Sequence, residues 1–287
     1  EQKERWLPQV ATGEKILSIG MTEPNGGSDL AALKSTAVKA DDGSGDWIIN
    51  GSKTFITNGY QCDLAVVAIR TDPSKGAKGI SLFAVDTSLP GFSVGRVLDK
   101  VGQDDSDTAE LAFDGVRVPV RFRIGEEGRG FAMQMQQFQE ERLWGAAACL
   151  KSHEYIIAKT IEYTRERKVF GRSVLDNQVV HFKLAEMQTE VELLRSLIYR
   201  AAEALVAGED VTRLATMAKL KAGRLGRELT DACLQYWGGM GFTNETPVSR
   251  AYRDSRLTSI GGGADEVMLM VLCKMMGTLP GLKKGNA

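Results

Sequence analysis

Hydrophobic and polar positions alternate in short runs between residues 16 and 120. Turn-forming residues separate the runs, and Asn50-Gly51 lies between two of them as a strong hairpin signal, because both residues tolerate positive φ. Strands at this spacing, without helices between them, predict an antiparallel β-sandwich or barrel. The runs are residues 35–40, 47–49, 53–56, 64–69, 80–85 and 111–113.

After Gly125 the hydrophobic period becomes helical. Apolar residues step by four and three through residues 180–205, which predicts a coiled-coil-like seam between near-antiparallel helices. A further helix is expected over residues 214–236, and a short and a Met-rich helix after it. The seam comprises Val180, Leu184, Met187, Val191, Leu194, Ile198, Ala201 and Leu205.

The predicted fold class is therefore α+β and multidomain. An antiparallel β-sandwich or barrel domain over residues 13–125 is followed by a C-terminal four-helix-type bundle over residues 126–287. Residues 1–12 have the pattern of the charged end of a helix, with a loop expected at Pro8.

Composition and charge exclude several classes of function. The formal net charge of -1 offers no general attraction to nucleic acid or to an anionic membrane. The chain has no apolar run of the ~18 residues that a membrane span requires. Four scattered cysteines and two histidines give no zinc-ligand spacing, so no metal is expected and the thiols are predicted to be reduced and structural.

Five stretches are candidates for a functional role, and each also has a purely structural interpretation. Adjacent carboxylates at Glu140 and Glu141 are either a general base or a solvated helix face. The glycine-rich residues 22–29 either approach a ligand or form a plain turn, and Phe55 read alone favours core packing. The other two stretches are the basic residues 167–172, which hold phosphates or complement a helix dipole, and the glycines at 261–263, which bind an oxygen atom or form a loop.

The order of the motifs is more specific than any one of them. Over essentially the whole chain, the sequence resembles the acyl-CoA dehydrogenases. It departs from them at its start, where members have an N-terminal helical domain of roughly a hundred residues. Residues 1–12 are expected to be the end of that domain, which helps to form the substrate pocket and flavin site. The motifs, in order, are TEPNGGSD, KTFITNG, SDTAELAFDGVRVP, FQEERLWG, RERKVFGRSVLDNQ, LQYWGGMGF and YRDSRLTSIGGGADE.

The resemblance implies FAD-dependent oxidation of an acyl-CoA thioester to the trans-2-enoyl-CoA in fatty acid β-oxidation. The implied electron acceptor is an electron-transfer flavoprotein, and the implied assembly is a homodimer or homotetramer. The implied compartment is the bacterial cytoplasm or the mitochondrial matrix.

The resemblance also implies roles for individual residues. Phe55 would cover the flavin ring, and Thr57 would hydrogen-bond near the flavin nitrogen that receives hydride. The positions that match contacts to the ring or ribityl chain are Ile19, Met21, Thr22, Gly27 and Ser28. Those that match contacts to the pyrophosphate and adenosine of a neighbouring subunit's FAD are Arg167, Phe170, Gln178, Gln235 and Gly239, and Ala264 and Glu266 are further cofactor positions.

The catalytic base is assigned through the same resemblance. Many relatives carry it as a Glu in the loop before the last helix, where this chain has Gly262. The long-chain and isovaleryl branches place it instead before an Arg in the first long helix, which corresponds to Glu141 before Arg142. Glu140 would point about 100° away on a helix. The Gly262 backbone amide would stabilise the thioester oxygen, and Ser28, Arg142 and Gly262 are the substrate-binding positions.

Three alternatives stay open at the level of sequence. An acyl-CoA oxidase or a nitroalkane-oxidising enzyme shares the scaffold, but the chain shows neither a longer C-terminal extension nor an Asp base. A non-catalytic helical scaffold or partner-binding module without flavin is the third. Because Gly262 replaces a bulky Glu, a long-chain or branched acyl-CoA is the predicted substrate.

Overall fold

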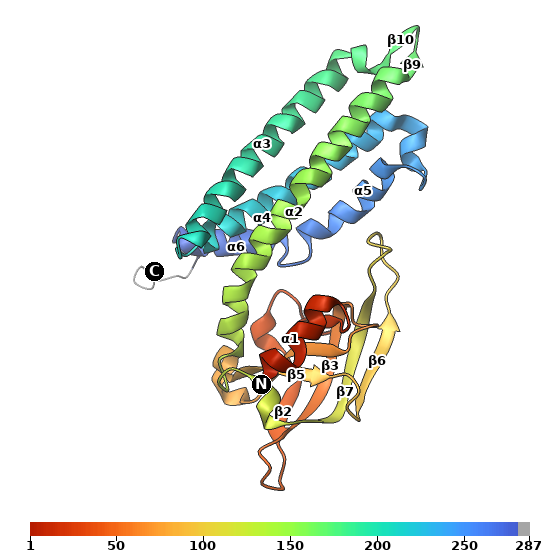
Figure 1. Ribbon diagram of the computed structural model, residues 1–287. Coiled ribbons are helices and arrows are strands. Elements are labelled where there is room, and N and C mark those ends of the chain that lie inside the picture. Colours follow the sequence, from red (N-terminus) through yellow and green to blue (C-terminus); the bar gives the residue numbers. More distant parts are fainter. Residues whose placement is uncertain (281–287) are drawn as a thin grey trace. The chain divides into compact units, whose positions relative to one another are not determined.

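The computed structural model describes residues 1–280 and divides into two compact units (Figure 1). The first comprises Glu1–Lys100 and Asp104–Gln136, and the second comprises Val101–Gln103 and the chain from Gln137 onward. The first unit is built on a β-sheet and the second consists mainly of helices, which confirms the predicted α+β class. The division between the two units falls at residue 136, inside a long helix. The domain boundary at residue 125 stays a prediction.

The first unit contains one complete helix, the first turns of a second helix and one eight-stranded sheet. Three short 3₁₀ turns lie at Leu30–Ala32, Pro73–Gly79 and Val120–Phe122. Its helix and strands are α1 (Gln2–Thr12), β1 (Leu17–Gly20), β2 (Thr36–Lys39), β3 (Trp47–Thr57), β4 (Leu64–Arg70), β5 (Ile80–Asp86), β6 (Phe92–Val97), β7 (Thr108–Val118) and β8 (Arg123–Ile124).

The strand order is β6-β7-β3-β2-β4-β5-β8, with β1 beside β4. Most neighbouring strands are antiparallel, as predicted, but β1 runs parallel to β4, and β2 meets β4 in a single parallel pair. The all-antiparallel prediction is therefore wrong at β4. The reason is connectivity, because the β2–β3 hairpin lies between β1 and β4 in the chain and lets β4 return in the direction of β1.

Asn50-Gly51 does not form the predicted hairpin. It lies inside β3, where the register against β7 shifts between Ile49 and Gly51. Gly51 has a φ of 141°, and a Cβ atom there would clash with the Ser35 side chain. Glycine is therefore required by a bulge with a close neighbour, and the reversal between β2 and β3 occurs at residues 40–46 instead.

Helix α1 packs on the sheet of its own unit. Trp6 is buried, with its ring centroid 4.7 Å from that of Phe122. The helix continues through Pro8, where a loop was predicted. Burial of Trp6 supplies tertiary packing that offsets the hydrogen bond lost at the proline.

The second unit contains five helices among the described residues. Short 3₁₀ turns follow at Val174–Asp176, Gly238–Phe242 and Arg256–Ser259. The elements are α2 (Gly130–Glu166, which begins in the first unit), β9 (Lys168–Val169), β10 (Arg172–Ser173), α3 (Gln178–Val206), α4 (Thr212–Trp237), α5 (Pro247–Ser255) and α6 (Asp265–Met275).

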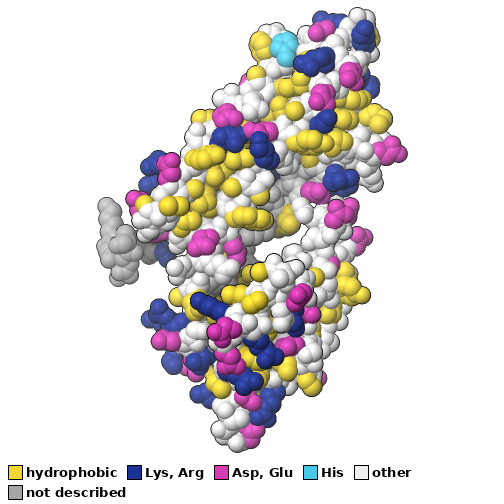
Figure 2. Space-filling view, viewed as in Figure 1, with side chains coloured by type: hydrophobic (Ala, Val, Ile, Leu, Met, Phe, Trp, Pro, Cys, Tyr) yellow, Lys and Arg dark blue, Asp and Glu magenta, His cyan; other side chains and the backbone are white. Residues whose placement is uncertain are grey.

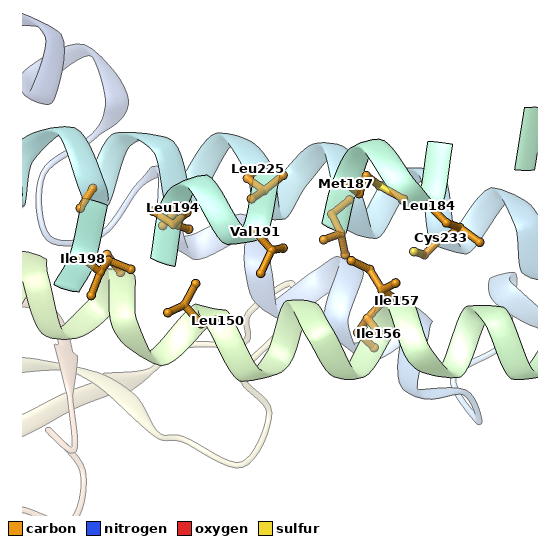
Figure 3. Packing of buried hydrophobic residues seen from close by; sticks show 14 of the residues in the cluster. Leu150, Ile156, Ile157, Leu184, Met187, Val191, Leu194, Ile198, Leu225 and Cys233 are labelled. Carbon is orange, nitrogen blue, oxygen red and sulfur yellow. The ribbon is translucent and has the colours of Figure 1, made fainter. Parts of the chain in front are cut away.

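The predicted seam on α3 is buried from Val180 to Ala201, and Leu205 is partly buried. Its side chains meet those of α2 and α4 in one core (Figure 3). On α2, Leu143 and Leu150 are buried in this core, whereas Ala147 is exposed. Within residues 1–280, no helix is long and apolar enough to cross a bilayer.

Candidate active site

In the first unit, the segment from β1 to Thr22 runs beside the end of β3. The Thr54 backbone N–H donates to the Thr22 carbonyl at 2.9 Å, and the Asn58 amide donates to the Leu17 carbonyl at 3.3 Å. This arrangement brings together three of the predicted flavin-binding side chains, all exposed: Ile19, Phe55 and Thr57.

Phe55 is the most unusual residue of this surface. Its side chain is 68% exposed and its backbone has a φ of 59°. A positive φ is uncommon for a bulky residue, and such strain concentrates at ligand sites. The alternative in which Phe55 packs in the core is wrong, because the register shift between Lys53 and Ile56 turns it out of the sheet.

The loop over residues 22–29 is anchored by the buried side chain of Glu23. A tight turn within it is closed by a pair of backbone hydrogen bonds between Glu23 and Gly26. The buried Glu23 carboxylate accepts from the Lys34 and Ser35 backbone N–H groups and from the Lys53 ammonium. Burial works to raise the pKa of Glu23, but these donors outweigh it and hold that pKa below its usual value.

The predicted residues of this loop differ in accessibility. Gly27 and Ser28 are exposed, and Thr22 is half-buried. A Cβ at Gly27 would lie 3.2 Å from the Thr22 Cγ2, so the backbone passes close to that side chain. Met21 is buried in a small apolar cluster, which leaves its backbone as the part able to contact a ligand.

In the second unit, the two candidate bases on α2 differ in how far their side chains are buried. Glu140 is exposed, whereas Glu141 is half-buried and accepts a hydrogen bond from the Gln137 side-chain amide at 3.0 Å. Burial raises the pKa of Glu141, although Gln137 and Arg142 oppose the shift. A carboxyl group with a raised pKa is the better proton acceptor.

Arg142 links α2 to the glycine loop before α6. A Cβ at Gly263 would lie 3.7 Å from an Arg142 terminal nitrogen, and the guanidinium carbon lies 5.5 Å from the Phe138 ring centroid. The buried Arg142 Nε has no hydrogen-bond partner within the part of the chain that the structure describes. Gly262 has a φ of 64°, and among the described residues only its chain neighbours come within 4 Å of where a Cβ atom would stand. Its surroundings are open.

The first turn of α6 contains the last two predicted cofactor residues. Ala264 is the N-cap, and Glu266 is exposed. Between them, Asp265 is buried and lies 3.5 Å from Arg224 and 3.6 Å from Arg227.

A third group of predicted residues meets at the junction of α2, α3 and α4. The Arg167 guanidinium donates to the Tyr163 hydroxyl at 2.9 Å, and the Tyr163 ring stacks on Trp237 with centroids 4.1 Å apart. A Cβ at Gly238 would lie 3.9 Å from Arg167, next to Gly239.

The start of α3 joins the same junction. The Tyr236 hydroxyl donates to the Val179 carbonyl at 3.2 Å, which brings Gln178 towards Gln235; both side chains are exposed. Phe170, in the turn between β9 and β10, is fully exposed with a φ of 52°.

Two buried lysines near these sites were not predicted. Lys53 lies on β3 and Lys219 on α4, and they are 0% and 4% exposed. Each could have been found from the sequence as a charge in an apolar position. Lys53 stands between Ile49 and Ile56 in a strand pattern, and Lys219 lies beside Ala218 and Ala222 on the apolar side of its helix.

Family models match most of the chain. The middle domain of acyl-CoA dehydrogenases matches residues 18–116, and their C-terminal domain matches residues 128–277.

Individual relatives agree with the family models. The short-chain specific acyl-CoA dehydrogenase of Megasphaera elsdenii is 40% identical over 94% of this chain and 70% of its own length. The long-chain specific mitochondrial enzyme of Sus scrofa is 39% identical over 96% of this chain and 64% of its own length. A chain in the solved structure titled for the electron transferring flavoprotein of Acidaminococcus fermentans is 38% identical, with a TM-score of 0.91 over 96% of this chain and 72% of that chain.

Proposed function

Because this chain belongs to the acyl-CoA dehydrogenase family, an oxidoreductase family whose cofactor is FAD, we propose that Glu141 removes the α-proton of an acyl-CoA thioester in the α,β-dehydrogenation that yields the trans-2-enoyl-CoA. The observation that carries this proposal is the environment of Glu141 on α2. Glu141 is half-buried with a raised pKa, and its neighbour Arg142 lies against the glycine loop before α6.

The residues of the first unit fit a flavin. An aromatic ring at Phe55 and an aliphatic side chain at Ile19 are exposed beside the Thr57 hydroxyl, as a flat apolar ring with polar edges requires. A Cβ placed on Gly26 would have no heavy atom closer than 3.9 Å, so the loop backbone is free to approach a ligand. FAD, when bound, supplies the acceptor for the two electrons that leave the β-carbon.

The proton transfer depends on the surroundings of Glu141. The α-proton of a thioester is weakly acidic, so a carboxylate must be both close and basic. Partial burial supplies the basicity, and the Gln137 amide restrains the carboxylate. Arg142 on the next residue keeps positive charge near the developing enolate.

The thioester oxygen needs a donor as negative charge develops on it. The Gly262 backbone N–H is the candidate, since its positive φ and open surroundings leave room for the substrate. No side chain is needed for this role, which is consistent with glycine at this position.

The junction of α2, α3 and α4 is proposed to bind the pyrophosphate and adenosine of a neighbouring subunit's FAD. Arg167 is held by Tyr163, and exposed amides at Gln178 and Gln235 offer donors. Phe170 is a bulky apolar side chain that the described residues 1–280 leave fully exposed. On the face shown in Figure 2, hydrophobic side chains gather on the helical unit among charged ones. Both observations support a homodimer or homotetramer.

The proposed electron acceptor is an electron-transfer flavoprotein. The similar chain in the structure titled for the electron transferring flavoprotein of Acidaminococcus fermentans supports this partner. The relatives include a bacterial and a mitochondrial enzyme, so the bacterial cytoplasm or the mitochondrial matrix stays a prediction.

A long-chain or branched acyl-CoA is proposed as the substrate. The relatives do not decide chain length, because a short-chain enzyme and a long-chain enzyme are 40% and 39% identical. The support is the open space at Gly262, where a Cβ atom would meet no heavy atom of the described residues within 4 Å apart from its chain neighbours.

The direct test is anaerobic titration of the FAD-loaded protein with acyl-CoAs of graded length and branching. Bleaching of the flavin absorbance by an acyl-CoA, followed by reoxidation with an electron-transfer flavoprotein, is the expected result. A protein that binds FAD but is bleached by no acyl-CoA would contradict the reaction. Fastest bleaching by butyryl-CoA would contradict only the substrate.

A further inference from the structure

Lys219 is a buried cation that the proposed reaction has not used. It lies on α4, is 4% exposed, and donates a hydrogen bond to the Gly263 carbonyl. Burial of an ammonium group is costly unless specific partners compensate for it.

No neighbouring acid in residues 1–280 is paired with Lys219 alone. Burial is the main cause that lowers the pKa of Lys219, and Asp265 is the acid that most favours the charged lysine, but Asp265 also pairs with Arg224 and Arg227. Arg142 is close enough to disfavour a second positive charge. The hydrogen bond to the loop is therefore the contact specific to this lysine.

The loop that Lys219 holds consists largely of glycine. Gly261, Gly262 and Gly263 follow one another, and the last two have φ values of 64° and 98°. Glycine loses more conformational entropy on ordering than any other residue, so this segment needs an external restraint to keep one conformation. Lys219 provides it from a different helix, 44 residues away in sequence.

We propose that Lys219 is a positioning residue for the reaction: by holding the Gly263 carbonyl, it restrains the glycine loop in the conformation that directs the Gly262 N–H towards the substrate thioester oxygen. This inference rests on the proposed role of the Gly262 amide. Lys219 itself contacts neither the substrate nor the cofactor in this scheme. It acts through the backbone of the loop, as a donor that orders an oxyanion-stabilising amide in advance.

The test compares Lys219→Met, which keeps length and apolar volume, with Lys219→Arg, which keeps charge and donors. Lys221→Met is the matched control, because Lys221 is on the same helix and pairs with Glu190 at the surface. The first measurement is deuterium uptake in the peptide over residues 258–268. Faster uptake is expected in Lys219→Met, and wild-type uptake in Lys221→Met.

The second measurement reports carbonyl polarisation. A chromophoric aryl-acryloyl thioester of CoA absorbs at longer wavelength when a donor polarises its carbonyl. Wild-type protein and Lys221→Met should shift this band, and Lys219→Met should lose the shift while retaining FAD. The rate constant for flavin bleaching should fall roughly ten- to hundred-fold, less than the 10²- to 10³-fold typical for removing a donor outright. Lys219→Arg should recover part of the band shift and part of the bleaching rate.

The outcomes separate this inference from the proposed function. If the wild-type protein is bleached by acyl-CoA and Lys219→Met keeps wild-type uptake and band shift, the positioning role is wrong. If Lys219→Met loses stability and FAD but the protein that retains FAD is bleached at the wild-type rate, Lys219 is structural only. If the wild-type protein itself is not bleached, the proposed reaction fails, and the uptake measurement still decides whether Lys219 orders the loop. Should Lys219→Met not fold, Lys219→Gln takes its place in each comparison.

Discussion

The Lys53 Nζ lies 2.7 Å from the Glu23 Oε1, and the two side chains are 0% and 3% exposed. Lys53 also donates to the Ala68 carbonyl at 2.6 Å, so it joins the glycine-rich loop to the centre of the sheet. Breaking one side of a buried pair leaves an uncompensated charge. The loop proposed to bind flavin is therefore coupled to the stability of its unit.

Replacement of one partner of this pair should destabilise the protein strongly. Glu23→Gln or Lys53→Met is expected to lower the free energy of unfolding by about 3–5 kcal/mol and to reduce FAD content. Replacing both together should cost less than the sum, because no charge is left unpaired. Chemical denaturation measures the first effect and flavin absorbance the second. Lys39→Met, which breaks an exposed pair with Glu127, is the control and should change stability by less than ~1 kcal/mol.

Glu141→Gln should abolish most flavin bleaching by substrate without loss of FAD. The amide keeps the shape of the side chain but accepts no proton, and loss of a general base typically costs ~10² to 10⁴ in rate. Stopped-flow absorbance under anaerobic conditions measures the rate. Glu140→Gln is the matched control and should bleach at nearly the wild-type rate. If the two variants exchange their behaviour, the base is Glu140.

Arg167→Ala should weaken FAD retention. The guanidinium is held by Tyr163 beside Gly238, and a hydrogen bond from a charged group contributes about 1.5–3 kcal/mol. The dissociation constant for FAD should rise about 10- to 100-fold, measured by flavin fluorescence after gel filtration. Light scattering of the same samples reports whether the oligomer weakens. Arg165→Ala, an exposed neighbour on α2, should leave both unchanged; unaltered FAD occupancy in Arg167→Ala would contradict the assignment.

His153 should make the protein less stable as the pH falls from about 6.5 to 4. Burial lowers its pKa to about 4, against an ordinary value of about 6.5. In this range the unfolded chain binds a proton that the folded protein does not, so up to roughly 3 kcal/mol of stability is lost as the pH falls.

The measurement is the free energy of unfolding of wild type and His153→Gln across this pH range. The variant should show a flatter dependence on pH. His181→Gln, which removes an exposed histidine, should retain the wild-type slope. Parallel curves for all three proteins would show that His153 does not titrate as described.

The fold class and the long helices could be predicted from sequence because their signals are local. Alternation marks strands, and the spacing of Val180 to Ala201 marks the buried side of α3, so burial follows from periodicity alone. The parallel pairing of β1 with β4 could not be predicted, since it depends on which strands meet across the chain. Asn50-Gly51 misled for a similar reason: a dipeptide that suits a turn also suits a bulge beside a close neighbour.

By itself, the sequence determined the order of motifs, and with it the residue types available for flavin and acyl-CoA chemistry. Tertiary structure alone decided which of them meet. It exposes Phe55 at a positive φ, half-buries Glu141 but not Glu140, and brings Lys219 to Gly263. The physical reason is that pKa, strain and the orientation of a backbone amide depend on neighbours distant in sequence, which local patterns do not encode.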